Sequence, residues 1–115
     1  MDFELEAEIP GIPAESQQRL LRVLAAQPNL EAVWLFGSRA FGRHRSGSDI
    51  DLCLDGPGLS HRDRLRLMAA LEELLLPWQV DLVLRQELPA DLQAHLQRVG
   101  RCLWKRPSLQ APPQG

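Results

Sequence analysis

The sequence predicts an α/β protein, built as two layers with a small mixed β-sheet and helices packed on one side. Stretches with apolar residues at helical spacing alternate with short apolar runs, in the order helix, strand, strand, helix, strand, helix. The chain has 115 residues, of which 44% are hydrophobic, and this suits one domain with a single modest core. We expect the domain to span residues 14–106, between an N-terminal arm (1–13) and a disordered tail (107–115) rich in proline and glutamine.

Three stretches combine apolar residues at helical spacing with a residue that ends the helix, and they span about 14–27, 61–76 and 89–99. In the first stretch, Leu20, Leu21 and Leu24 form one apolar face, and Pro28 stops the helix. Ser60 can cap the second stretch, because its side-chain oxygen can accept a hydrogen bond from a free backbone N–H of the first turn. The spacing in all three predicts helices that bury one face against a sheet.

Three apolar runs have the length of strands and cover 31–36, 49–54 and 79–84. The first run is mostly apolar, as expected for a strand that is covered on both faces. A strong turn signal, Asp55-Gly56-Pro57-Gly58, ends the second run. Cys53 lies within the second run, so we expect a small core residue there rather than a disulfide or a nucleophile. Residues 102–104 form a last short element, either a strand or an extended segment.

Charge and composition exclude several classes of function. The net charge is −2, so the chain lacks the basic surface typical of a protein that binds nucleic acid stably, which weighs against template-directed polymerisation. Cys53 and Cys102 fit no metal-binding spacing. The acidic N-terminus has no signal-peptide pattern, and no apolar run approaches the length of a membrane span. We therefore expect a cytoplasmic protein with no membrane partner.

The most informative motif is a Gly-Ser pair, Gly37-Ser38, followed after ten intervening residues by Asp49 and Asp51. Alternation along a strand places both aspartates on one face, with their apolar neighbours on the other. Two adjacent carboxylates repel each other, and a divalent cation between them removes that cost. Magnesium typically binds one or two carboxylates together with substrate phosphates. The motif therefore predicts a phosphate-binding turn beside a Mg²⁺ site.

The turn also carries groups that suit a triphosphate. Gly37 allows close approach of the backbone to a phosphate, and a short helix expected at 38–41 offers free N–H groups and the Ser38 hydroxyl. Arg39 and Arg43 add positive charge near the same place. An ion pair to a nearby carboxylate is an equally good interpretation of Arg39. An exposed position in a solvated loop is as good an interpretation of Arg43 as a phosphate contact.

These motifs resemble the nucleotidyltransferase superfamily of DNA polymerase beta, and in particular its minimal nucleotidyltransferase (MNT) proteins. The signature of that family is Gly-Ser, ten residues, Asp-x-Asp and a third Asp on a later strand, which here is Asp81. The resemblance implies that Asp49, Asp51 and Asp81 are catalytic and hold one or two Mg²⁺ ions, and that Asp81 helps to deprotonate the attacking hydroxyl. The implied reaction is in-line attack of that hydroxyl on the α-phosphorus of ATP. One departure is Phe41, where many relatives carry a second arginine.

The resemblance also implies a partner. Larger relatives carry a helical domain that holds the acceptor, and nothing in this sequence is expected to supply one. Minimal members often pair with a HEPN-domain ribonuclease toxin, and the MNT protein acts as antitoxin by transferring AMP from ATP to a tyrosine of the toxin. Two alternatives stay open. The chain could be a small-molecule nucleotidyltransferase completed by a separate helical subunit, or a binding antitoxin that does not catalyse.

Overall fold

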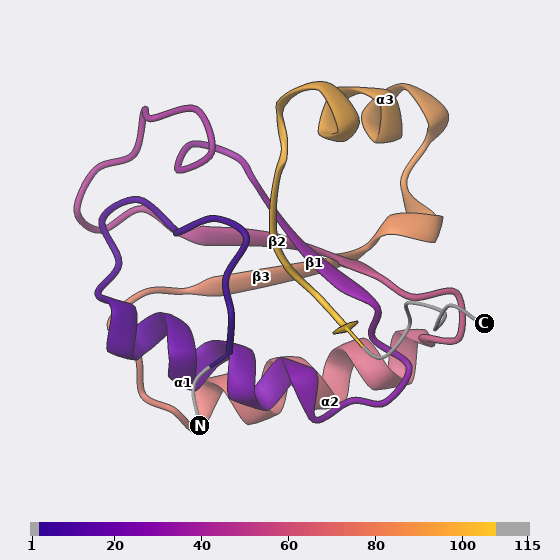
Figure 1. Cartoon of the computed structure of the whole chain (residues 1–115), viewed down its shortest axis with the longest axis horizontal. Coiled ribbons are helices and arrows are strands. Elements are labelled where there is room, and N and C mark those ends of the chain that lie inside the picture. The colour runs from indigo at the N-terminus through magenta and orange to yellow at the C-terminus, as the bar shows by residue number, and fades with distance from the viewer. Residues whose placement is uncertain (1–2, 108–115) are drawn as a thin grey trace, which may run out of the picture.

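A four-stranded sheet forms the centre of the computed structural model, which describes residues 3–107 (Figure 1). The elements in chain order are α1 (Ala14–Ala25), β1 (Ala32–Phe36), β2 (Ile50–Asp55), α2 (His61–Glu72), β3 (Val80–Leu84), the 3-10 helix η1 (Arg85–Glu87), α3 (Ala90–Val99) and β4 (Arg101–Lys105). The strand order is β3-β2-β1-β4, with β1 antiparallel to both β2 and β4, and β2 parallel to β3. The predicted small mixed sheet is confirmed, and its last element is a strand.

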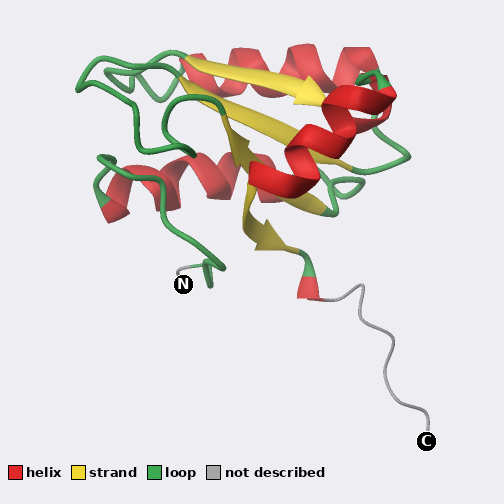
Figure 2. Ribbon diagram, turned by 90° about the horizontal axis from the view of Figure 1, so that it is seen from above, coloured by secondary structure: helices red, strands yellow, loops and turns green. Residues whose placement is uncertain are grey.

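The core lies between one face of the sheet and the helices α1 and α2. Because successive side chains of a strand point to opposite faces, β1, β2 and β3 each send alternate apolar residues toward these helices. The buried strand residues on this face are Val33, Leu35, Ile50, Leu52, Leu54, Leu82 and Leu84. Figures 1 and 2 show α1 and α2 on this side of the sheet and α3 on the other. The predicted layer of helices on one side of the sheet is present, but it consists of α1 and α2, because α3 lies on the other side.

The ends of the helices follow local backbone chemistry. Ser60 caps α2 as predicted, because its hydroxyl accepts from the Asp63 N–H while the Asp63 carboxylate accepts from the Ser60 N–H. The predicted end of this helix at residue 76 is wrong, since α2 ends at Glu72. Tight turns follow, and Leu75 takes a left-handed conformation with φ of 55°. Pro77 accounts for the early end in part, since a proline disfavours helical backbone in the residue before it.

The predicted short helix at 38–41 is also wrong. Residues 38–42 form consecutive turns, in which the Arg43 N–H donates to the Ser38 carbonyl at 2.9 Å. Gly42 has a φ of 74°, a left-handed conformation that no right-handed helix contains. The segment therefore keeps the tight curvature of a helical turn without continuing into a helix.

The N-terminal arm is packed against the domain rather than hanging free of it. Ile9 and Ile12 are buried in the core, and the Glu6 N–H donates to the Leu103 carbonyl of β4. Two adjacent glutamines of α1 hold the arm. The Gln17 side chain is 3% exposed and bonds to the backbone N–H and carbonyl of Ile9 and the carbonyl of Ile12. The Gln18 amide pairs with both backbone groups of Phe3.

Cys53 is fully buried in β2, as predicted for a core residue, and burial raises the pKa of its thiol to about 12. No helix within residues 3–107 is long and apolar enough to cross a bilayer. The tail expected at 107–115 lies outside the described residues from residue 108 onward.

The buried glutamine makes the attachment of the arm testable. We expect Gln17→Leu to lower the free energy of unfolding by about 1–3 kcal/mol, because the buried N–H of Ile9 loses its acceptor. The matched change Gln18→Leu should lower the free energy of unfolding less, because the half-buried backbone N–H and carbonyl of Phe3 can form hydrogen bonds with water instead. Urea unfolding of the three proteins measures both effects. A Gln17→Leu protein that unfolds at the wild-type urea concentration would contradict this account of the arm.

Candidate active site

Asp51 and Asp81 face each other across two parallel strands. They are direct partners in the register of β2 and β3, so their Cα atoms lie about one strand spacing, roughly 4.8 Å, apart. Their apolar neighbours Ile50 and Leu82 point into the core, so both carboxylates point to the opposite face of the sheet. Asp49 precedes β2 by one residue and is exposed. The strand predictions thus place two of the three aspartates as expected, with the third at the entrance to its strand.

The three carboxylates share one electrostatic environment. The pKa of Asp51 is raised, first by burial, then by the negative charge of Asp81 and then by that of Asp49. Repulsion of this kind is what a bound cation relieves. Within residues 3–107, no three metal-ligating side chains converge closely enough to form a preformed cage. Mg²⁺ does not need one, because it takes one or two carboxylates and completes its shell with water and substrate phosphates. The donor set therefore fits Mg²⁺.

Gly37 joins the turn to the carboxylates. It follows β1 directly and has a φ of 76°, a conformation that favours glycine. A Cβ built on Gly37 would overlap the Oδ2 atom of Asp51 and lie 3.0 Å from its Cγ. The position therefore disfavours a side chain for two independent reasons, the left-handed backbone and the contact with Asp51. The sequence predicted a glycine for close approach of a phosphate, but not its contact with the aspartate.

Most backbone N–H groups of the turn after Gly37 form hydrogen bonds within the turn itself. The N–H groups of residues 40–43 all donate to carbonyls of residues 37–39. Within residues 3–107, the N–H groups of Ser38 and Arg39, at the start of the turn, donate to no backbone carbonyl. Such free N–H groups beside a glycine are typical of an anion site. The predicted phosphate role of Gly37 and Ser38 keeps its physical basis although the short helix is absent.

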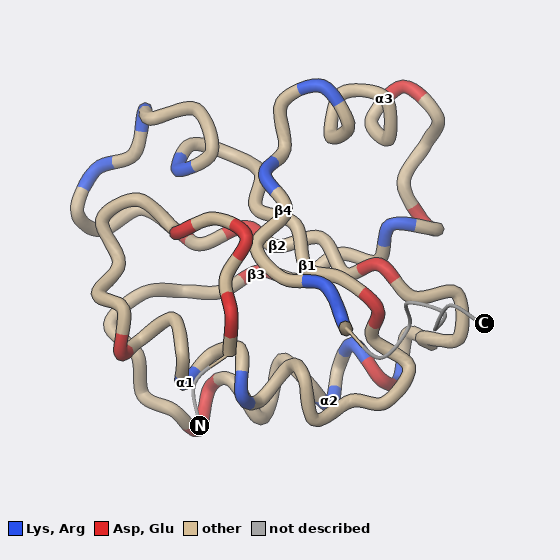
Figure 3. Tube along the Cα trace, in the orientation of Figure 1, with Lys and Arg blue, Asp and Glu red and all other residues tan. Residues whose placement is uncertain are grey.

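Arg39 differs from the two interpretations that the sequence allowed. Its side chain is 1% exposed, and its guanidinium donates to the backbone carbonyls of Pro10, Ser46 and Ser48. It pairs with no carboxylate among the described residues and is not presented to solvent as a phosphate ligand would be. Arg43 is exposed and makes no ion pair within residues 3–107. Figure 3 shows basic residues along the loop between β1 and β2.

Other features lie around the site but outside the predicted set. An apolar cavity of about 70 Å³ is lined by Phe36, the register partner of Asp51, and by residues of and just before α3, namely Leu88, Leu92, His95 and Leu96. A larger cavity of about 300 Å³ lies between the end of α2 and the start of β3, and none of the three aspartates lines it.

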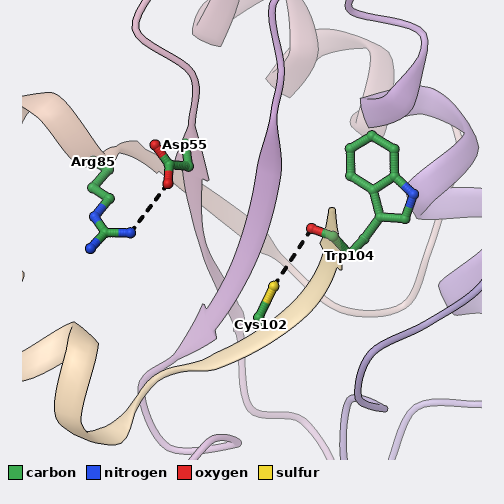
Figure 4. A network of polar contacts seen from close by, with 4 residues as sticks. All are labelled: Asp55, Arg85, Cys102 and Trp104. Carbon is green, nitrogen blue, oxygen red and sulfur yellow. Dashed lines mark hydrogen bonds and ion pairs between the residues drawn. The ribbon is translucent and has the colours of Figure 1, made fainter. Parts of the chain in front are cut away.

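An arginine, Arg85, packs on the same face of the sheet, near the end of β2. Arg85 forms an ion pair with Asp55 at 3.2 Å (Figure 4) and lies over the Trp34 ring at 5.5 Å. These contacts hold η1 against β1 and β2. Asp55 lies on β2 four residues after Asp51. Nothing in the spacing of the sequence indicates this contact, because it joins residues 30 positions apart.

Fold and site together define a nucleotidyltransferase of the polymerase beta type. Residues 18–108 match the family described as Polymerase beta, Nucleotidyltransferase, and the chain belongs to this family. The resemblance inferred from the Gly-Ser and Asp-x-Asp motifs is thereby confirmed.

The chain is also similar to individual proteins within this family and to solved structures. Over 52 residues the chain is 44% identical to the probable protein adenylyltransferase MntA of Haemophilus influenzae, a stretch that covers 44% of this chain and 46% of that protein. The chain thus aligns with less than half the length of this curated relative. Its fold matches a toxin–antitoxin protein crystallised with AMP-PNP, with a TM-score of 0.63 and 28% identity over 82% of this chain and 74% of that one. It also matches a chain in a complex of tri-AMPylated Shewanella oneidensis HEPN toxin with MNT antitoxin (TM-score 0.62, 24% identity, 82% and 73% coverage), and this match shows the fold alone.

The contact between Gly37 and Asp51 can be separated from the backbone conformation of the turn. Gly37→Ala and Gly42→Ala place the same methyl group at nearly the same φ, 76° and 74°, but only at Gly37 does the methyl meet another group. Each change should cost about 1–2 kcal/mol of stability for the left-handed backbone. Gly37→Ala should cost more, since Asp51 must also move. Thermal unfolding compares the two proteins, and equal losses would show that the aspartate is not held against the turn.

Proposed function

We propose that this protein is an adenylyltransferase that transfers AMP from ATP to a hydroxyl of a partner protein, a tyrosine of a cognate HEPN toxin, and so acts as an antitoxin. The observation that carries the proposal is the pairing of Asp51 with Asp81 in register, directly beside the Gly37 turn. A protein that only binds has no need of two carboxylates that repel each other on one face of a sheet.

Each group would have a distinct task. Free N–H groups of Ser38 and Arg39, the Ser38 hydroxyl and the exposed Arg43 would bind the triphosphate. Asp49, Asp51 and Asp81 would hold Mg²⁺, which when bound supplies positive charge against the phosphate oxygens. Asp81 lies on β3, whereas Asp49 and Asp51 lie just before and within β2, so Asp81 can reach the side where the acceptor enters. There its carboxylate would accept the proton of the attacking hydroxyl, whose oxygen bonds to the α-phosphorus of ATP while the bond to the β-phosphate breaks and pyrophosphate leaves.

The comparisons support this choice among the reactions of the family. The relative from Haemophilus influenzae is described as a probable protein adenylyltransferase, and its match includes 52 residues at 44% identity. A structural relative of 28% identity comes from a crystal structure of a toxin–antitoxin with AMP-PNP, an analogue of ATP. Both point to an adenosine nucleotide and to a protein partner, and this favours a protein over a small molecule as the acceptor.

The first test is nucleotide binding. Calorimetry with ATP and Mg²⁺ should show binding to the wild-type protein that weakens strongly in the double variant Asp49→Ala/Asp51→Ala, because the cation that holds the triphosphate loses its ligands. In the absence of Mg²⁺ the two proteins should differ much less. Equal affinities of both proteins for ATP in the presence of Mg²⁺ would contradict the assignment of the site.

The second test separates transfer from binding. We expect Asp81→Asn to abolish transfer while it largely spares ATP binding, because asparagine keeps the size of the side chain but cannot accept a proton. Intact-mass spectrometry of a co-expressed HEPN partner gives the readout: the wild-type protein adds the mass of AMP, and the variant leaves the partner unchanged.

The same experiment distinguishes the alternatives. A wild-type protein that binds its partner and ATP but adds no mass would be a binding antitoxin. Modification of the partner at the wild-type rate by the Asp81→Asn protein would remove Asp81 from the mechanism.

A further inference from the structure

We infer that Arg39 is a positioning residue, which ties the N-terminal arm to the loop before β2 and thereby places Asp49 beside Asp51. The inference rests on the proposed function, since it assigns Asp49 to the Mg²⁺ site. It also gives Arg39 a different task from the phosphate contact that its place in the motif suggested.

The guanidinium binds the peptide unit that leads into Asp49. Its Nε and Nη2 atoms donate to the Ser48 carbonyl at 3.3 and 2.8 Å, and Nη2 also reaches the Ser46 carbonyl at 3.5 Å. The Ser48 carbonyl belongs to the same planar peptide as the Asp49 nitrogen, so its direction sets where the Asp49 backbone begins. One residue later the strand bonds take over, as the Ile50 N–H donates to the Gln79 carbonyl at 2.9 Å. Asp49 thus lies between two backbone groups that are held by hydrogen bonds, the Ser48 carbonyl and the Ile50 N–H.

The third point of attachment comes from the arm. The Nη1 atom of Arg39 donates to the Pro10 carbonyl at 2.8 Å, across 29 positions of the chain. Gly11 follows with a φ of 81°, and a Cβ there would lie 2.9 Å from both Arg39 Nη1 and His44 Nε2. The arm therefore closes directly over the guanidinium. Gln17 holds the arm in this place by binding the backbone on both sides of Pro10, at Ile9 and Ile12.

Burial decides between positioning and phosphate contact. A charged group that is 1% exposed is costly unless its donors are satisfied, and here all three nitrogens donate to backbone carbonyls. A phosphate could reach this guanidinium only after the arm and the loop had moved apart. The loop has a further anchor, since the Trp78 indole N–H donates to the Ser46 carbonyl at 3.2 Å. Arg39 thus fixes the backbone of the loop, while the exposed Arg43 is free to meet the substrate.

The test uses Arg39→Gln, with Arg43→Gln as the matched control from the exposed part of the same loop. Calorimetric titration of Mg²⁺ at fixed ATP should show cation affinity about 10–100-fold weaker in Arg39→Gln, as for residues that orient metal ligands. At saturating Mg²⁺ its ATP affinity should return close to that of the wild-type protein. Arg43→Gln should behave in the opposite way, with weaker ATP binding at every Mg²⁺ concentration.

Hydrogen exchange supplies a readout that does not depend on nucleotide. The backbone N–H groups of residues 43–49 should exchange faster in Arg39→Gln than in the wild-type protein, while those of β1 and β2 stay protected. Arg39→Lys should restore part of the protection, because an ammonium group can still donate to the Ser48 carbonyl. Gly11→Ala, which pushes a methyl group against Arg39, should reproduce the Arg39→Gln result and serves if that variant does not fold.

The outcomes are distinguishable. Weaker ATP binding in Arg39→Gln at all Mg²⁺ concentrations, with unchanged exchange of residues 43–49, would overturn the inference and return Arg39 to the phosphate site. Faster exchange with unchanged Mg²⁺ affinity would equally overturn it, because the loop would then not set the cation site. A wild-type protein that binds no ATP with Mg²⁺ would instead count against the proposed function.

Discussion

Repulsion between two carboxylates in facing positions of parallel strands is the constraint on which this site depends. The register of β2 and β3 places the Cα atoms of Asp51 and Asp81 directly opposite each other, so the two backbones cannot move apart without disturbing the sheet. No arginine cancels the repulsion within residues 3–107, since Arg39 is bound to carbonyls and Arg85 pairs with Asp55 farther along the strand. The negative field is therefore left for a ligand to neutralise. A sheet with a buried apolar face is rigid enough to hold such an unfavourable pair in place.

Two different solutions to buried charge appear in the same small domain. Asp51 and Asp81 are half-buried, and no cation of the protein pairs with them within residues 3–107. Their repulsion lowers the stability of the fold at the proposed active site. Arg39 is buried much more deeply, yet backbone oxygens surround it, so its charge contributes to order. The two carboxylates have no partner of opposite charge among the described residues, whereas the guanidinium of Arg39 donates hydrogen bonds from all three nitrogens. The contrast separates the residues that meet substrate from those that arrange them.

The sequence predicted those parts of the molecule that follow from short-range periodicity. Alternation along a strand is enough to place Asp51 and Asp81 on the face away from Ile50 and Leu82, and the strands and the Ser60 cap follow equally local rules. The turn at 38–42 was beyond that reach, because its course depends on the left-handed Gly42. The partners of Arg39 were beyond it too. They are backbone carbonyls, which every residue type carries, and one of them lies 29 positions away.

The strand order has a consequence for the synthesis of the chain. The central strand β1 is flanked by β2 and by β4, and β4 consists of Arg101–Lys105, near the end of the described chain. During translation β1, β2 and α2 can assemble early, but one edge of β1 has no partner until β4 leaves the ribosome. An apolar strand with an open edge is a site for pairing with other chains. The nascent protein thus passes through a stage in which a central, largely buried strand has an open edge, and the synthesis of β4 removes that hazard.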